Sequence, residues 1–256
     1  MPQTPKTCPN SSDEERKPCP HGELVRVNND GSLCLWECSK CCAEEKKKDE
    51  LREGLIQKEA RYSRIMYSGS GYGNIPRRFA NKTLENYSVN SAQQRKVVEL
   101  CRNYVVHFER VKDQGTSMVF CGKPGTGKTH LVYAIVNALQ KKSITAVVRT
   151  AADMTSEVKE AYKSDHSDVT PTTVSSKFAE FDLLVIDEVG VQVSSDAEKR
   201  IFFNIINKRY ENMLPTILIS NLALPELTEF IGERVVDRMR ENRGVVFAFD
   251  WGSYRK

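Results

Sequence analysis

Short apolar runs alternate with amphipathic stretches along the second two-thirds of this chain. Apolar residues recur every three or four positions in the amphipathic stretches, which predicts helices, and the short runs predict buried strands. Strands alternating with helices indicate a parallel sheet covered on both faces, an α/β fold. The predicted strands are Ser117–Cys121, Ile144–Val148, Leu183–Asp187, Thr216–Ser220 and Val245–Phe249, and the predicted helices are 91–113, Thr129–Lys142, a region before Leu183, Asp196–Asn212 and Ile231–Glu241.

The first third of the chain has a different pattern. Residues 1–18 hold almost nothing apolar and predict a disordered tail. A turn-forming Asn-Asn-Asp-Gly stretch next to the apolar Leu33–Trp36 predicts a small hairpin-like module. Ala43–Met66 is rich in Lys, Glu and Arg and predicts a charged helix with one apolar stripe. Such a stripe packs on its own domain or on a partner, and the sequence favours neither.

Three glycines within five residues interrupt this pattern at Ser68–Gly73. A segment of this kind predicts a flexible linker and therefore a domain boundary. The sequence thus divides into a disordered tail at 1–18, a module and helix at 19–67, a linker and lead-in at 68–90, and an α/β domain at 91–256.

Composition and charge narrow the class of protein. Of the 256 residues, 39% are hydrophobic and 28% are charged, which is ordinary for a globular domain. No apolar run is long enough to cross a bilayer, and the first residues lack the apolar stretch of a secretory signal. We therefore expect a cytoplasmic protein with no membrane partner. The formal net charge of +4 permits nucleic-acid binding without demanding it.

The segment from Gly122 to Thr129 fits the pattern G-x-x-x-x-G-K-[ST], follows a predicted strand and opens a predicted helix. In this setting backbone N–H groups and the helix N-terminus face phosphates, which predicts an ATP site. Lys128 is expected to reach the β- and γ-phosphates, and Thr129 to ligate Mg²⁺. The predicted nucleotide-binding residues are Gly122, Pro124, Gly125, Thr126, Gly127, Lys128, Thr129, His130 and Asp187.

Polar side chains also end two other predicted strands. Asp187 and Glu188 follow a buried strand, at the edge where parallel sheets bind ligands. Asp187 is expected to hold the Mg²⁺ shell, and Glu188 to activate the attacking water. Asn221 follows another strand and is a candidate for contacting the γ-phosphate or the water. The alternative for Glu188 is a plain surface glutamate, and the alternative for Asn221 is an ordinary turn-forming asparagine.

The combined motifs resemble the DnaC-type helicase loaders, a branch of the AAA+ ATPases, over about residues 70–256. The lead-in Ile75–Phe79 and Leu84–Tyr87 also resembles this family, and we expect it to carry no chemistry. Besides the P-loop, the resemblance rests on Val185–Glu188, Pro215–Asn221, Gly232–Met239 and Asp250–Arg255.

This resemblance implies a three-layer AAA+ core, ATP hydrolysis that is weak in an isolated subunit, and self-association through the ATPase interface. It implies that Asn221 is the first sensor residue, Arg234 the arginine finger that reaches a neighbouring subunit, and Arg238 the second sensor. The alternative for both arginines is a helix stabilised by ion pairs with Glu233, Asp237 and Glu241.

The implied partners are a DnaB-type replicative helicase hexamer and single-stranded DNA. Family members bind single-stranded DNA on the ATPase domain, and Ala151–Lys163 occupies the corresponding stretch. Lys159, Lys163 and Tyr162 supply cations and a ring for stacking, although they equally fit a solvated face.

Six of the eight cysteines fall within the first 42 residues, which points to metal because cytosolic thiols stay reduced. Similarity to loader-like phage and transposon ATPases implies a structural zinc held by Cys19, His21, Cys38 and Cys41. Cys34 is the alternative to His21, since only one residue separates Cys19 from His21. Reduced cysteines without metal are the other alternative.

Three functions fit these observations. The first is an ATP-dependent loader of the replicative helicase onto single-stranded DNA. The second is an IstB-type helper of a transposase, which shares the ATPase core. The third is a non-enzymatic zinc adaptor, which conflicts with the presence of Lys128, Thr129, Asp187 and Glu188.

Overall fold

The computed structural model describes residues 25–29, 33–37, 39–67, 73–163, 170–190 and 195–254. The chain divides into two compact units, Met1–Arg61 and Tyr62–Lys256. This division is coarser than the predicted one into tail, module, linker and core, so those boundaries stay predictions. The predicted linker lies almost wholly outside the described residues.

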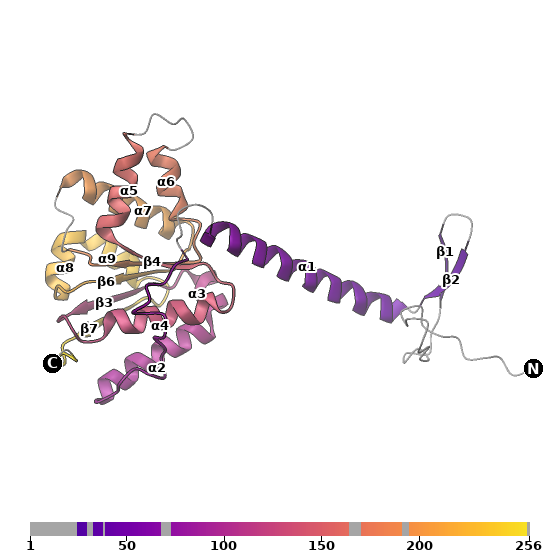
Figure 1. Cartoon of the computed structure of the whole chain (residues 1–256), viewed down its shortest axis with the longest axis horizontal. Coiled ribbons are helices and arrows are strands. Elements are labelled where there is room, and N and C mark those ends of the chain that lie inside the picture. The colour runs from indigo at the N-terminus through magenta and orange to yellow at the C-terminus, as the bar shows by residue number, and fades with distance from the viewer. Residues whose placement is uncertain are drawn as a thin grey trace, which may run out of the picture. The chain divides into compact units, whose positions relative to one another are not determined.

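The first unit contains the hairpin that the sequence predicts. Strands β1 (Val25–Asn29) and β2 (Leu33–Glu37) are antiparallel, with Val25 opposite Glu37 and Asn29 opposite Leu33. Helix α1 (Ser39–Tyr67) follows and is 29 residues long, so it begins earlier than the sequence predicts (Figure 1).

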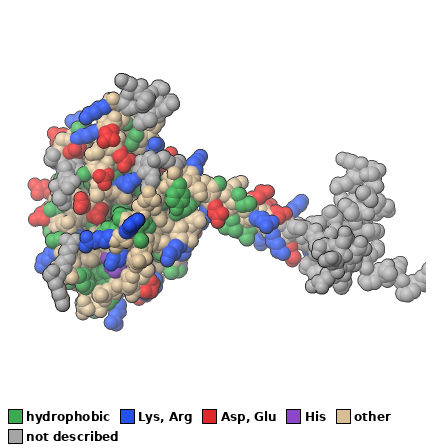
Figure 2. Space-filling model, viewed as in Figure 1, with side chains coloured by type: hydrophobic (Ala, Val, Ile, Leu, Met, Phe, Trp, Pro, Cys, Tyr) green, Lys and Arg blue, Asp and Glu red, His purple; other side chains and the backbone are tan. Residues whose placement is uncertain are grey.

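The apolar residues of α1 divide into an exposed set and a buried set. Leu51, Leu55 and Ile56 are 68%, 57% and 60% exposed, whereas Ile65 and Met66 in the last turn are buried in the core of the second unit. Basic and acidic side chains also lie along the face of the helix that Figure 2 shows. Among the residues that the structure describes, the buried apolar side chains of α1 thus lie in its last turn.

The second unit is built on a five-stranded parallel sheet in the order β4-β5-β6-β3-β7. All five predicted strands are confirmed: two have the predicted bounds, two are shifted by one or two residues, and one ends a residue early. The strands are β3 (Met118–Gly122), β4 (Ala146–Thr150), β5 (Leu183–Asp187), β6 (Thr216–Ile219) and β7 (Val245–Phe249).

Helices cover both faces of this sheet (Figure 1). One layer comprises α2 (Ala92–Val106), α3 (Phe108–Gln114) and α4 (Lys128–Gln140). The other comprises α5 (Ala151–Ala161), α6 (Pro171–Lys177), α7 (Asp196–Glu211), α8 (Leu224–Ile231) and α9 (Glu233–Arg240). The predicted three-layer α/β architecture is confirmed.

Alternation along the strands produces two separate cores. In β3, Met118 and Phe120 belong to the core under α2 and α4, whereas Val119 and Cys121 belong to the core under α5 to α9. All four are fully buried. Because successive side chains of a strand point to opposite faces, an uninterrupted apolar strand fills both cores at once.

Two helix predictions need correction. The predicted helix 91–113 is interrupted at His107, so α2 and α3 are separate helices. The predicted helix Ile231–Glu241 is interrupted at Gly232, whose φ of 84° is not helical, and α8 lies before it. Helix α8 is not among the predicted helices, and its first turn contains a proline, a residue that is well tolerated there.

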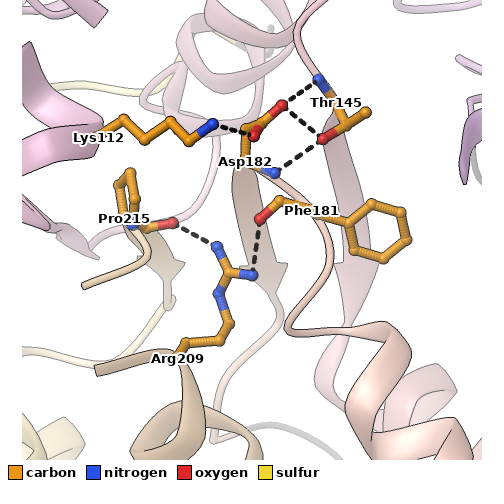
Figure 3. Close-up of polar contacts among 6 residues, drawn as sticks. All are labelled: Lys112, Thr145, Phe181, Asp182, Arg209 and Pro215. Atoms are coloured by element: carbon orange, nitrogen blue, oxygen red, sulfur yellow. Dashed lines mark hydrogen bonds and ion pairs between the residues drawn. The ribbon is translucent and has the colours of Figure 1, made fainter. Parts of the chain in front are cut away.

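A buried arginine joins the N-terminal ends of two strands. Arg209 of α7 is fully buried, and its guanidinium donates to the carbonyls of Phe178, Phe181 and Pro215 at 2.6, 3.0 and 2.7 Å. It also donates to the Thr216 hydroxyl at 3.0 Å. Figure 3 shows the arginine between the segments that lead into β5 and β6. Burial lowers the pKa of Arg209 to about 9, so it stays charged at neutral pH.

Asp182 extends this network to a third strand (Figure 3). It accepts hydrogen bonds from the amide and hydroxyl of Thr145 at 2.9 and 2.7 Å, and an ion pair at 2.6 Å joins it to Lys112 of α3. Burial opposes its ionisation, but the bonds from Lys112 and Thr145 prevail and lower its pKa to about 2. The charged form therefore stabilises the fold.

We expect Asp182→Asn to lower the free energy of unfolding at pH 7 by about 1–3 kcal/mol, because hydrogen bonds to a charged group are lost. The folded pKa is depressed, so the wild-type contribution is present above pH ~4 and is lost as pH falls towards ~2. Urea unfolding should therefore show a difference between the proteins that shrinks on acidification. Asp113→Asn, the same change at an exposed position of α3, is the control. A constant difference across this range would contradict the assignment.

Candidate nucleotide-binding site

The loop between β3 and α4 needs glycine at two positions. Gly122 has a φ of 114°, and a Cβ there would lie 2.6 Å from the Phe249 carbonyl oxygen. Gly127 has a φ of 93°, and a Cβ there would lie 2.6 Å from the ring of Tyr87. Both the backbone conformation and the close approach exclude a side chain. The loop therefore takes the curled form that the motif predicts.

Lys128 begins α4 and is directed back over this loop. Its ammonium group donates to the carbonyl oxygens of Gly122 and Lys123, each at 2.7 Å, and the residue is only 4% exposed. A buried ammonium beside the N-terminal end of a helix creates a positive region where phosphates bind.

Two acidic side chains end β5 beside the loop. Burial raises the pKa of Asp187, and the charge of Glu188 adds to this effect. The Glu188 amide, the Lys128 ammonium and the Thr129 hydroxyl oppose it. Glu188 has a φ of 58°, a conformation that non-glycine residues rarely adopt. The chain thus turns at the end of the strand, and Asp187 and Glu188 line the same cavity as the loop.

These segments enclose a cleft of about 520 Å³. The cleft brings together nearly all of the predicted nucleotide-site residues, from three different strand ends. Asn221, which follows β6, is exposed and also faces the cleft. The predicted residues that line it are Pro124, Gly125, Thr126, Gly127, Lys128, Thr129, His130, Asp187, Glu188 and Asn221. Gly122 lies at the end of β3, where it shapes the loop.

Neither predicted arginine lines the cleft of its own chain. Arg238 donates to the Asn207 side chain and lies over the ring of Tyr210, 4.9 Å from its centroid. Arg234 lies on the exposed surface of α9. Within the described residues neither arginine forms an ion pair with Glu233, Asp237 or Glu241, the partners proposed in the alternative. A role for Arg234 or Arg238 at a neighbouring subunit stays a prediction.

The lead-in before α2 contributes to the cleft, contrary to expectation. Arg78 and Lys82 line it, as do Asn86 and Tyr87. The lead-in has no strand or helix pattern, so its position over the loop is not predictable from periodicity. The available signals are the pair Arg77-Arg78 next to an aromatic residue and the resemblance of this segment to the family.

His130 joins the lead-in to α4. Its Nε2 lies 3.1 Å from the Thr83 carbonyl oxygen and 2.9 Å from the Asn86 side-chain oxygen. Because both neighbours are acceptors, Nε2 carries the proton. Burial lowers the pKa of His130, and the charge of Lys82 adds to this effect while the Thr83 carbonyl opposes it.

The predicted zinc ligands Cys19, His21 and Cys38, and the side chain of Cys41, lie outside the described residues. In the part of the chain that is described, no group of three or more His, Cys, Asp or Glu residues could hold a metal ion. The zinc module therefore stays a prediction. Among the described residues, no helix is long and apolar enough to span a membrane.

Comparison with known proteins agrees with the fold and the cleft. Residues 38–246 match the family described as IstB-like ATP binding protein. The replicative helicase loader DnaC of Escherichia coli K12 is 34% identical over 211 residues, which cover 82% of this chain and 84% of that protein. The replicative helicase loader DnaC of Buchnera aphidicola subsp. Baizongia pistaciae is 36% identical over 186 residues, or 73% and 74% of the two chains.

A solved structure gives the same result. The crystal structure of the DnaC helicase loader superimposes with a TM-score of 0.60 at 26% identity, covering 68% of this chain and 99% of that one. The chain therefore belongs to the IstB-like ATP-binding protein family. The resemblance to the DnaC-type replicative helicase loaders within it is confirmed.

We expect Lys128→Ala to weaken binding of ATP·Mg roughly 10- to 100-fold, because charge-assisted hydrogen bonds to the phosphates are lost. Isothermal titration calorimetry measures this directly. Lys123→Ala removes an exposed lysine from the same loop and should bind ATP like the wild type. Unchanged affinity in Lys128→Ala would show that the cleft is not the ATP site.

Proposed function

We propose that this protein binds and hydrolyses ATP in the P-loop cleft and uses the nucleotide cycle to load a replicative DNA helicase onto single-stranded DNA. The similarity to Escherichia coli DnaC carries this proposal, because it covers more than four-fifths of both chains. The matched family region begins at residue 38, so it includes α1 as well as the ATPase unit.

The positions of the cleft residues support the roles that we propose for them. Thr129 and Asp187 would supply oxygen ligands for Mg²⁺, which would neutralise charge on the phosphates of the nucleotide. Lys128 holds the same phosphates by charge. Glu188 orients the attacking water, and Asn221 faces the γ-phosphate from the neighbouring strand. Their convergence on one cleft supports these roles.

A surface on α1 is the proposed helicase contact. Leu51, Leu55 and Ile56 place three large apolar side chains in solvent, within one and a half turns of helix. Exposed apolar residues grouped in this way are typical of protein interaction sites. An amphipathic helix can lay such a stripe into an apolar groove of a partner.

Leu51→Glu combined with Leu55→Glu should reduce co-purification with the replicative helicase at least about 10-fold, because charges would enter an apolar contact. The ATPase unit should retain its melting temperature, since both leucines are exposed. Gln57→Glu adds a charge to the same part of α1 without removing an apolar group, and should have little effect. No complex between wild-type protein and helicase under any nucleotide condition would overturn the proposed function itself.

Single-stranded DNA is proposed to bind near the C-terminal end of α5. Tyr162 is 71% exposed and offers a ring for base stacking, and Lys163 follows it. Lys159, in contrast, forms an ion pair with Glu198 at 2.6 Å. We therefore assign Tyr162 and Lys163 a larger share of DNA binding than Lys159.

Arg234 is proposed to act on the ATP of a neighbouring subunit. It is exposed and outside its own cleft, which is where a residue acting in trans must lie. Such an arginine contributes on the order of 10³–10⁵ in rate, so turnover would depend on assembly. Arg238, which is engaged with Asn207 and Tyr210, is less available for this role.

A mixing experiment tests this assignment. Arg234→Ala and Glu188→Gln should each have low ATPase activity in the presence of helicase and single-stranded DNA. Mixed together, they should regain activity above the sum of the two, because an intact Glu188 would then face an intact Arg234. Arg240→Ala, an exposed arginine on the same helix, is the control and should hydrolyse ATP normally. Wild-type activity in Arg234→Ala would contradict the assignment.

The alternative of a transposase helper is favoured only by the description of the matched family as IstB-like. The Escherichia coli and Buchnera aphidicola relatives that cover 82% and 73% of the chain are named as replicative helicase loaders, which supports the loader function. Binding to a transposase rather than to a helicase would favour the alternative.

Zinc remains part of the proposal for the N-terminal region, with Cys19, His21, Cys38 and Cys41 as its ligands. Structural zinc contributes roughly 10–16 kcal/mol of apparent binding free energy, which is sufficient to fold a module this short. Metal analysis of the purified full chain should therefore find about one zinc per chain, the number that four ligands hold. A metal-free preparation with an intact hairpin would exclude it.

A further inference from the structure

Two hydrogen-bond donors from distant parts of the chain meet at one carbonyl of the P-loop. The Thr126 carbonyl oxygen accepts from the Tyr87 hydroxyl at 3.0 Å and from the Trp251 indole N–H at 2.9 Å. The preceding carbonyl, of Gly125, accepts from the amide N–H of Tyr254 at 2.9 Å. The lead-in and the segment after β7 thus both donate hydrogen bonds to main-chain carbonyls of the loop.

Because the peptide unit is planar and trans, these bonds also fix the direction of the N–H groups that face the phosphate site. The C=O and N–H of one peptide unit point in opposite directions. Holding the carbonyls of Gly125 and Thr126 on one side therefore directs the N–H groups of Thr126 and Gly127 to the other. P-loops bind phosphates with successive N–H groups of this kind.

We propose that these three donors, here called the clamp, set the orientation of two P-loop peptides and thereby the affinity for nucleotide. The clamp consists of the Tyr87 hydroxyl, the Trp251 indole N–H and the Tyr254 amide N–H. These groups are positioning groups, because they act through the loop. This inference rests on the proposed binding of ATP at the P-loop, but not on the helicase-loading function.

Packing fixes the clamp against the loop. The ring of Tyr87 is buried and leaves no space for a Cβ at Gly127. Tyr254 lies edge-on to this ring, 5.7 Å between centroids, and its hydroxyl donates to the Ser88 carbonyl at 2.5 Å. The Trp251 ring lies 4.7 Å from that of Phe249, the last residue of β7. The donors cannot shift far without disturbing these contacts.

Because two donors share the Thr126 carbonyl, single and double substitutions should affect ATP affinity differently. Tyr87→Phe and Trp251→Phe each remove one donor and keep a ring, and the other donor still satisfies Thr126. Each single variant should therefore weaken binding of ATP·Mg no more than about 3-fold. The double variant leaves a buried carbonyl without a donor and should weaken binding on the order of 10- to 100-fold, well beyond the product of the singles.

Isothermal titration calorimetry with ATP·Mg on the full chain measures these affinities, and thermal unfolding establishes that each variant is folded. Tyr104→Phe is the matched control, because its hydroxyl also donates to a main-chain carbonyl, that of Thr116 at 3.0 Å, but at the opposite edge of the sheet. It should leave ATP affinity unchanged. A loss of affinity in the double variant equal to the product of the singles, or none at all, would overturn the clamp.

The bond from Tyr254 provides a second test that does not depend on the double variant folding. Tyr254→Ala keeps the amide N–H and Tyr254→Pro removes it, at a position that is 37% exposed. The proline variant should bind ATP roughly 3- to 10-fold more weakly than the alanine variant. Equal affinities would contradict this part of the clamp. Lys128→Ala separates the two hypotheses: if it abolishes binding while the clamp variants behave like wild type, the ATP site stands and the clamp does not.

Discussion

The parallel arrangement of the five strands is the constraint on which the rest of the structure depends. Because all strands run in one direction, their C-terminal ends meet at one edge of the sheet. The P-loop follows β3, the two carboxylates end β5, Asn221 follows β6, and the segment carrying Trp251 follows β7. Residues separated by more than a hundred positions in the sequence therefore surround a single cleft.

Residues at the opposite edge of the sheet, at the N-terminal ends of the strands, stabilise the fold. Arg209 and Asp182 bind the segments that lead into β4, β5 and β6, through main-chain groups as well as side chains. These bonds satisfy polar groups that burial would otherwise leave without partners. The nucleotide cleft lies at the C-terminal ends of the same strands. It contains strained and charged groups, such as Glu188 in its left-handed conformation. The stabilising bonds thus lie at the N-terminal ends of the strands, and the nucleotide cleft lies at their C-terminal ends.

The parts of the fold and the site that the sequence predicts are those whose signal is local. Apolar runs mark the strands, and motifs at strand ends mark the P-loop and Asp187, so neighbouring residues alone are sufficient to find them. The break at His107 is not predictable in this way, because the apolar periodicity continues across it. The contribution of the lead-in also escapes prediction, since Tyr87 and Lys82 reach the cleft through tertiary packing and have no periodic pattern.

The hydrogen bonds of Arg209 have a consequence for how the sequence can vary. Three of its four acceptors are main-chain carbonyls, and every amino acid supplies such a carbonyl. The residues at 178 and 181 can therefore be exchanged, as far as this network is concerned, without loss of an acceptor. The arginine has no equivalent substitute, because no other side chain presents five donors in one planar group. The donor, Arg209, therefore tolerates substitution less than the residues whose carbonyls accept its hydrogen bonds.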